Sequence, residues 1–370
     1  MGKNYKGAFI LLFTMFFAAA SGAVKNKGGF IIYPARITDE TYKVYKVYEN
    51  GETRMILQLS FNGQSEASSG GTTIPQASPD KEHIAYCDDG IIRIKNILTG
   101  ENRKIAPLNN AGQFKIFING WSLDGKKFLY HIMENIEGDE GDYDGSPRAK
   151  KPGTQHGKAA GTAKEGHASG YFIYDTASGG TVPVPIKGIY VGWGAGNNII
   201  CQYPSEGSRE LISVDFSGNT ISLFKYRGWG AGDLNQINTG SRADKAVAMA
   251  GSFGKNNGVI IADLVKNTSS DITGREDWGK IHSPDISMSG TKISWLDGYY
   301  NEKERAYIYN SFVVDKKVIF KTQDYIDEYK WISESAVIVV TRSDSDVNST
   351  DELYVINPET GKILGMTPLE

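Results

Sequence analysis

Residues that could do chemistry lie mainly in irregular segments of this 370-residue chain, where carboxylates are interspersed with aromatic side chains. Such a mixture can hold sugars by stacking and hydrogen bonding, or basic peptides by charge and cation–π contact. The candidate binding residues are Asp39, Asp88, Asp89, Trp229, Trp278, Asp297, Tyr299, Tyr300, Glu302, Asp344 and Asp346. Asp side chains also form ordinary turns, so the pattern fits structural roles as well as binding.

The five histidines give little support for catalysis. His156 and His167 fall in a low-complexity segment, His83 and His131 lie in or beside predicted strands, and His282 precedes a turn. No three of them share a plausible metal-ligand spacing, and the chain has no G-x-S-x-G elbow. We therefore predict no catalytic residue, no metal site and no cofactor, and we favour a protein that is not an enzyme.

Two acidic runs resemble the start of a calcium-binding loop without completing one. The run at 140–145 has Lys151 at the twelfth position, where a bidentate acid is expected, and the run at 344–348 lacks the glycine. Neither is predicted to bind calcium.

A repeated sequence motif predicts the elements that position these residues. Asn119–Tyr130 reads NGWSLDGKKFLY, and looser copies occur at Gln76–Tyr86, Gly192–Cys201, Thr239–Met249, Ile286–Trp295 and Lys330–Val340. The residues that open the turns are 44, 72, 47, 46 and 45 positions apart. A period near 45 residues, with four short strands in each unit, is typical of a β-propeller.

Cutting the chain at this period predicts an all-β fold with seven four-stranded antiparallel blades, six or eight being the alternatives. The first blade shows three strands, which we assign to the second, third and fourth positions. The long spacing of 72 is explained by residues 134–170, which are rich in Gly, Ala, Lys and acids and predict a disordered insertion within blade 3. Residues 24–370 are then one propeller domain.

The turn Asp124-Gly125-Lys126 after Trp121-Ser122, with Ser78-Pro79-Asp80 and Ile173-Tyr174-Asp175, resembles the TolB-type, WD40-like (PD40-type) propeller repeat. This resemblance covers residues 28–368 and implies the propeller fold. It does not imply one function, because periplasmic scaffolds, peptidase propellers and polysaccharide-degrading enzymes share such repeats. Trp121, Trp193 and Trp331 are expected to pack between blades.

The amino terminus predicts export. Lys3 and Lys6 precede an apolar stretch at 8–20 and a small-residue cleavage site at 21–23, so residues 1–23 are predicted to be a signal peptide and the mature chain periplasmic or secreted. No transmembrane segment is expected after cleavage.

Removing Lys3 and Lys6 leaves 38 basic and 43 acidic residues, a balance that does not favour nucleic-acid binding. Cys87 and Cys201 fall in blades that are not neighbours and are predicted to be buried free thiols.

In a propeller, the first and third turns of each blade emerge on one face, here called the bottom face. The loops between second and third strands and the connections between blades emerge on the other, the top face, where all the candidate binding residues fall. We therefore predict a scaffold that binds an envelope or extracellular protein, or a polysaccharide. Two readings stay open: a glycoside hydrolase or lyase that uses top-face acids, and partner binding by the insertion itself.

Overall fold

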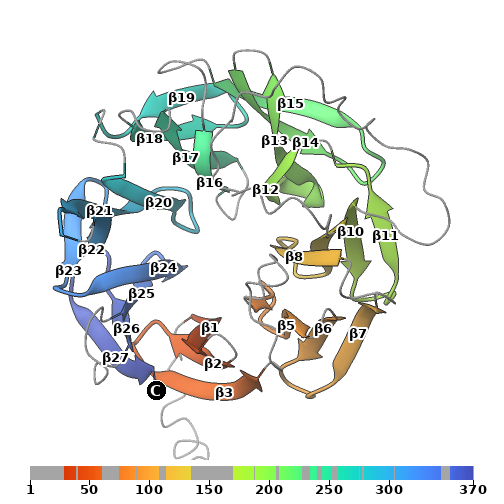
Figure 1. The fold of residues 1–370 in the computed structure, drawn as a ribbon, viewed down its shortest axis with the longest axis horizontal. Helices are drawn as coiled ribbons and strands as arrows, with labels where there is room; N and C mark the ends of the chain where they lie inside the picture. The colour runs from red at the N-terminus through yellow and green to blue at the C-terminus, as the bar shows by residue number, and fades with distance from the viewer. Residues whose placement is uncertain are drawn as a thin grey trace, which may run out of the picture.

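The structure is a computed structural model, and its β-strands form seven antiparallel sheets arranged in a ring (Figure 1). In every sheet, strands that follow each other in sequence are hydrogen-bonded neighbours. The chain is therefore a seven-bladed β-propeller, as the repeat predicted. The structure describes residues 29–38, 41–60, 75–88, 91–107, 114–134, 170–186, 188–205, 208–226, 234–239, 244–251, 257–274, 276, 279–303, 305–342 and 351–369.

The blades follow one another along the chain. Blades 1 to 3 are built from β1 (Phe30–Thr38), β2 (Thr41–Tyr48) and β3 (Thr53–Ser60); β4 (Gln76–Ala77), β5 (His83–Asp88), β6 (Ile91–Asn96) and β7 (Asn102–Pro107); and β8 (Phe114–Trp121), β9 (Lys127–Glu134), β10 (Gly170–Asp175) and β11 (Thr181–Val184). Blades 4 and 5 are built from β12 (Ile189–Trp193), β13 (Ile199–Ser205), β14 (Ser208–Val214) and β15 (Thr220–Tyr226); and β16 (Leu234–Thr239), β17 (Lys245–Gly251), β18 (Asn257–Asp263) and β19 (Thr268–Asp271). Blades 6 and 7 are built from β20 (Ile281–Ile286), β21 (Ile293–Asn301), β22 (Ala306–Val314) and β23 (Lys317–Lys321); and β24 (Tyr325–Ser333), β25 (Ala336–Arg342), β26 (Asp351–Ile356) and β27 (Ile363–Leu369).

Blade 1 has three strands among the described residues, whereas the other six blades have four. Lys81, in the first turn of blade 2, places its Nζ atom 4.4 Å from the centroid of the Phe30 ring. The first turn of a blade lies on the bottom face, so the start of β1 lies there too. β1 therefore runs from the bottom face to the top face, in the same direction as β5, the second strand of blade 2. The three strands take the second, third and fourth positions, as predicted.

The hydrophobic core is divided among the gaps between blades. Strand side chains alternate, so Leu129 packs toward blade 4 while Phe128 and Tyr130 pack toward blade 2. The described residues form seven buried clusters, and each joins two neighbouring blades. Seven blades in an open row would share only six gaps, so seven clusters mean that the ring is closed.

The repeat tryptophans pack between blades, as expected from the sequence. Trp121 is buried and its indole Nε1 donates to the carbonyl oxygen of Gln76 at 2.8 Å, one blade back. Trp193 donates in the same way to the carbonyl of Gly120 at 3.2 Å, and Trp331 donates to the Ser294 hydroxyl at 3.0 Å. Each indole ring thus fills the gap between two blades, and its Nε1–H group has a hydrogen-bond acceptor.

The described strands of blade 1 all come from the amino-terminal part of the chain, and those of blade 7 all come from the carboxy-terminal part, so no described strand of one blade pairs with the other. Contacts between side chains therefore close the ring. The cluster shared by the two blades joins residues of β1 and β2 to residues of β25 and β26. The Tyr33 hydroxyl donates to Glu328 of β24, and the Thr53 and Thr367 hydroxyls lie 2.5 Å apart. Gly51 and Gly365 approach so closely that a Cβ on Gly365 would lie 2.2 Å from the Gly51 carbonyl oxygen.

Several sequence predictions concern residues outside the described ranges. The signal peptide at 1–23 is one, and the disordered insertion is another: β9 ends at Glu134, β10 begins at Gly170, and residues 135–169 between them are not described. Neither cysteine forms a disulfide and both are buried, as predicted. Among the described residues, no helix has the length and apolar character needed to cross a membrane.

Candidate functional site

The predicted binding residues are only partly described. Asp88, Asp297, Tyr299, Tyr300 and Glu302 belong to the described part of the chain. The others lie outside it: Asp39, Asp89, Trp229, Trp278, Asp344 and Asp346, together with both calcium-like runs. Four of the five described residues fall on blade 6.

Asp88 has a structural use. Its Oδ2 atom lies 2.9 Å from the Nε atom of Arg93, across the hairpin formed by β5 and β6, and both side chains are mostly buried. Blade 2 lies across the ring from blade 6 (Figure 1). Asp88 is therefore not brought together with the blade 6 residues.

Blade 6 carries a two-stranded extension on the top face. Its first strand, β20, pairs with β21 only as far as Asp297, and its fourth strand, β23, pairs with β22 only from Ser311. Beyond a register shift at Asp297 and Gly298, β21 and β22 pair with each other through residues 298–301 and 306–309, and the Gly298 amide also donates to the carbonyl of Lys280 at 2.9 Å. We call these residues and their turn the blade 6 hairpin. Four extended residues carry it about 13 Å beyond the four-stranded sheet.

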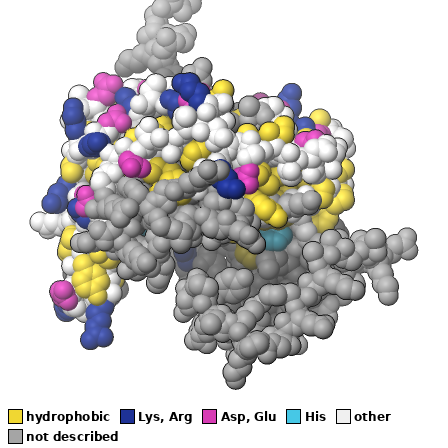
Figure 2. All heavy atoms as spheres, turned by 90° about the horizontal axis from the view of Figure 1, so that it is seen from above, with side chains coloured by type: hydrophobic (Ala, Val, Ile, Leu, Met, Phe, Trp, Pro, Cys, Tyr) yellow, Lys and Arg dark blue, Asp and Glu magenta, His cyan; other side chains and the backbone are white. Residues whose placement is uncertain are grey.

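The blade 6 hairpin exposes aromatic side chains on both faces. Tyr299 and Tyr300 have relative exposures of 50% and 45%, and as consecutive strand residues they point to opposite faces. Tyr300 contacts Tyr307 of the partner strand, with the ring centroids 5.4 Å apart and the ring planes at 63°. Figure 2 shows hydrophobic side chains on a projecting part at the left, the side on which Figure 1 places blade 6, with charged side chains at its end.

The base of the hairpin is anchored on β20 and on the connection before it. Tyr309 lies against His282, with the ring centroids 4.8 Å apart, and its hydroxyl donates to the carbonyl of Gly279 at 2.7 Å. Gly279 has φ +90°, and a Cβ there would meet the Tyr307 ring at 2.6 Å. Burial lowers the pKa of His282, so this ring stays neutral at neutral pH.

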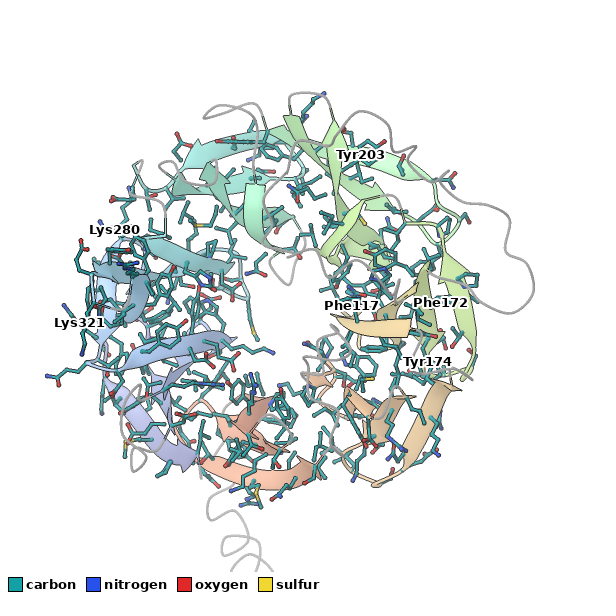
Figure 3. The ribbon with its side chains drawn as sticks, viewed as in Figure 1. Phe117, Phe172, Tyr174, Tyr203, Lys280 and Lys321 are labelled. Carbon is teal, nitrogen blue, oxygen red and sulfur yellow. The ribbon has the colours of Figure 1, made fainter. Side chains whose placement is uncertain are left out.

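Asp297 lies where the hairpin leaves the sheet. Burial raises the pKa of its carboxyl group, although Lys280 acts in the opposite direction. Its Oδ1 atom is buried without a hydrogen-bond partner among the described residues. Lys280 also pairs with Glu276 at 2.8 Å, and Figure 3 places Lys280 and Lys321 on the outer side of blade 6. The hairpin therefore rises from a base that carries charges of both signs.

Ionisable residues on the inner strands were not singled out by the sequence. Burial raises the pKa of Asp285 in β20 to about 6. Tyr33 donates its hydroxyl to Glu328, and the Tyr329 hydroxyl donates to the carbonyl of Ser283 at 2.5 Å. These groups tie neighbouring blades together near the axis. Strand periodicity alone does not reveal which inner-strand polar residue is buried.

A second site missed by the sequence lies at the bottom face between blades 2 and 3. A cavity of about 120 Å³ is lined there by His83, Ile94, Asn96, Glu101, Arg103, Tyr174 and Thr176. Next to it, the turn before β5 brings together three possible metal ligands, Asp80, Glu82 and His83. The sequence did contain a signal for this site, because the turn of blade 2 departs from the repeat. Blade 2 has Glu82 and His83 where blade 3 has Lys126 and Lys127.

Comparison with known proteins gives matches in structure but not in sequence. No protein-family model and no curated protein matches the chain. The β-propeller domain of the Trilobed protease from Pyrococcus furiosus matches with a TM-score of 0.52 and 13% identity, over 92% of this chain and 96% of that one. The acylaminoacyl peptidase of Pyrococcus horikoshii matches with a TM-score of 0.50 and 13% identity, over 94% of this chain and 53% of that one.

This chain thus spans about half the length of that peptidase. TolB from Acinetobacter baumannii is also a structural neighbour, with a TM-score of 0.45 and 15% identity, over 97% of this chain and 68% of that one. Likeness at these identities shows a shared fold and not a shared activity. The chain is a seven-bladed β-propeller, and the β-propeller domain of a protease, a peptidase and TolB are among the solved structures that resemble it.

Proposed function

We propose that this chain is an exported, non-catalytic propeller that binds a protein partner of the cell envelope or extracellular space through the blade 6 hairpin. One observation carries the proposal: Tyr299 and Tyr300 are half exposed on a two-stranded extension that rises from a rigid blade. Tyrosine is enriched at protein interfaces because its ring buries much area and loses little conformational entropy.

The geometry of the hairpin favours a protein over a polysaccharide. A sugar chain stacks on flat rings that lie in a row on one side, whereas Tyr299 and Tyr300 point to opposite faces. The Tyr300 and Tyr307 rings share a face but meet at 63°, so they do not form a continuous platform. An element with aromatic side chains on both faces suits insertion into a groove of another protein.

The charges at the base of the hairpin support the same proposal. Lys280, Lys321 and Glu276 surround Asp297, and Glu302 lies in the hairpin turn. Charges of both signs beside an apolar centre form the polar rim of a typical interface, which contributes more to specificity than to affinity. Export rests on residues 1–23, which the sequence pattern predicts to be a signal peptide.

Capture of a partner by variant proteins tests the proposal. The mature protein would be used as bait in envelope extracts of the cells that produce it, and the affinity for each captured protein would then be measured with the purified pair. The double variant Tyr299→Ser/Tyr300→Ser is expected to bind at least about thirtyfold more weakly, since two interface tyrosines together contribute about 2 kcal/mol or more.

Tyr203 provides a matched control. It is also an exposed tyrosine, at 42%, and it lies on blade 4, away from blade 6 (Figure 3). Tyr203→Ser is expected to bind like the unaltered protein. Equal binding by the double variant and the unaltered protein would refute the proposal. A purified polysaccharide that binds, and that the double variant fails to bind, would replace the protein partner with a sugar.

A further inference from the structure

The first turn of blade 2 keeps the backbone of the repeat and changes its chemistry. In blade 3, the Ser122 hydroxyl and the amide of Lys126 both donate to Asp124 Oδ1, at 2.6 and 3.0 Å. In blade 2, the Ser78 hydroxyl and the amide of Glu82 donate to Asp80 Oδ1 in the same pattern. The two lysines that follow in blade 3 are replaced in blade 2 by Glu82 and His83.

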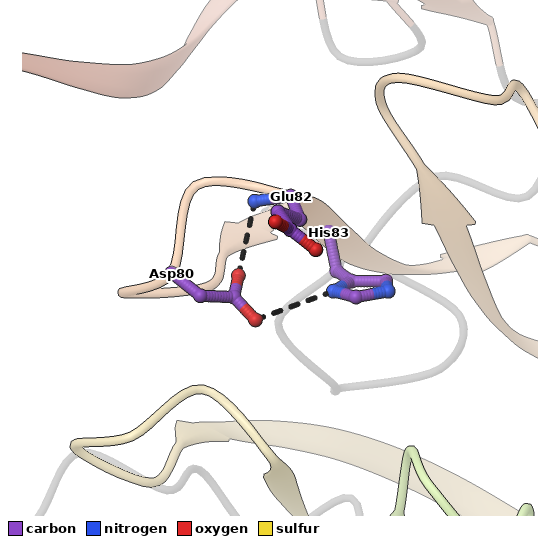
Figure 4. Close-up of side chains that lie close together, drawn as sticks. All are labelled: Asp80, Glu82 and His83. Carbon is purple, nitrogen blue, oxygen red and sulfur yellow. Dashed lines mark hydrogen bonds and ion pairs between the residues drawn. The ribbon is translucent and has the colours of Figure 1, made fainter.

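This replacement brings together three side chains with metal-binding atoms. One ligand atom from each of Asp80, Glu82 and His83 lies within 4.8 Å of the other two (Figure 4). Asp80 Oδ1 is engaged by the turn, so Oδ2 is the carboxylate oxygen that faces His83. The Nδ1 atom of His83 is buried and has no hydrogen-bond partner among the described residues.

The separation of these atoms fits a shared cation better than a direct hydrogen bond. Asp80 Oδ2 lies 3.5 Å from His83 Nδ1, which exceeds the usual length of a hydrogen bond. Two ligands bound at about 2.0–2.1 Å in a tetrahedral site are about 3.4 Å apart. The observed gap is therefore close to what an ion between the two atoms requires.

We propose that Asp80, Glu82 and His83 bind a divalent transition-metal ion of the zinc type. An imidazole nitrogen with two carboxylates suits zinc and its neighbours, whereas calcium and magnesium prefer a shell of oxygen atoms alone. Asp80 and Glu82 are exposed, so an ion can enter from solvent, and water supplies the fourth position. The site lies at the contact between blades 2 and 3, because the Asp80 carboxyl packs against Gly125.

The residue behind His83 sets the affinity of this site. Asn96 Oδ1 accepts hydrogen bonds from the amides of Leu98 and Thr99, so its Nδ2 atom is the one that faces His83 Nε2, at 3.4 Å. A ring with metal on Nδ1 carries its proton on Nε2 and needs an acceptor there. Asn96 offers none, whereas aspartate would. Asp175 and Asp263 form the corresponding turns of blades 3 and 5 with the same pair of amide bonds.

Two variants with opposite effects test the proposal. The chelator-treated mature protein would be titrated with Zn²⁺ by calorimetry and with Co²⁺ by visible absorption, which reports tetrahedral coordination. Glu82→Lys/His83→Lys copies the blade 3 turn and is expected to weaken binding about a hundredfold or more, since even indirect partners of a metal contribute tenfold to a hundredfold. Asn96→Asp is expected to strengthen binding about tenfold.

Further variants separate metal binding from folding. Glu82→Gln changes one exposed side chain and is expected to weaken Zn²⁺ binding with an unchanged melting temperature of the metal-free protein. Asp124→Asn, in the matched turn of blade 3, is expected to leave Zn²⁺ affinity unchanged. The proposal is overturned if the unaltered protein binds neither ion. It is also overturned if Glu82→Lys/His83→Lys binds as tightly as the unaltered protein, which would assign the ion to another part of the chain.

Discussion

At the scale of single residues, Asp285 is a carboxyl group in surroundings that disfavour its charge. It lies in the innermost strand of blade 6, and burial raises its pKa to about 6, against the opposing effects of the Ile286 amide and Lys330. In the unfolded chain the same group ionises near its ordinary value of 3.8. The folded protein therefore holds a proton on Asp285 over a pH range in which the unfolded chain has lost it.

Asp285 is expected to make the protein less stable as pH rises from about 4 to 6, because the folded state binds the extra proton in that window. Asp285→Asn keeps the acceptor for the Ile286 amide and removes the charge. Its free energy of unfolding should match that of the unaltered protein near pH 4 and exceed it by about 2 kcal/mol at pH 7. Urea denaturation at several pH values measures this difference. A difference that does not change with pH would contradict the prediction.

The sequence identified some residues of the candidate sites and missed others for physical reasons. Tyr299 and Tyr300 could be predicted, because a top-face loop with adjacent aromatics and acids is visible in a linear pattern. Glu82 and His83 were missed because they occupy a turn whose repeat makes it look purely structural. Asp285 was missed because its raised pKa depends on what packs over it, and no pattern of strand residues reports that.

At the scale of elements, the blade 6 hairpin depends on its anchor. A two-stranded hairpin alone is marginally stable in water, so the contacts of Tyr307 and Tyr309 with Gly279 and His282 must hold it in place. The repeat predicted β21 and β22 but not their extension. A hairpin extends beyond its sheet from the point at which the first and fourth strands stop pairing with it. The strand sequences do not mark that point.

Gly279→Ala is expected to loosen this hairpin and leave the blades intact. The added methyl group would strain a backbone at φ +90° and collide with the Tyr307 ring, at a combined cost of about 2 kcal/mol or more. Amide hydrogen exchange at 298–301 and 306–309 should become about thirtyfold faster, with exchange in β24–β27 unchanged. Gly274→Ala is the control, because a Cβ there meets no atom within 4 Å. Equal exchange in both variants would show that Gly279 is not the anchor.

At the scale of the whole molecule, the fold was largely predictable and its closure was not. Six copies of one turn, with four of their five spacings close to 45 residues, indicated seven blades and a first blade with three visible strands. The contact between blades 1 and 7 joins residues more than 290 positions apart, such as Tyr33 and Glu328. A local repeat carries no information about a contact of that range.

A covalent link across blades 1 and 7 is expected to stabilise the ring. Thr53 and Thr367 face each other with hydroxyls 2.5 Å apart, and they are separated by 314 positions in sequence. A disulfide in Thr53→Cys/Thr367→Cys would restrict the unfolded chain and add at most about 5 kcal/mol to the free energy of unfolding. Thermal unfolding with and without reductant measures the gain, and each single cysteine variant is the control. A disulfide that forms without raising the melting temperature would contradict the prediction.

The absence of shared strands between the first and last blades, among the residues described, also sets how this molecule should respond to force. If residues near the two ends were pulled apart, the load would fall first on the side-chain contacts between β1–β3 and β24–β27, since no backbone ladder joins those blades. A force–extension trace should begin with a small rupture that opens the circle. Larger events should follow as individual sheets unravel from either terminus.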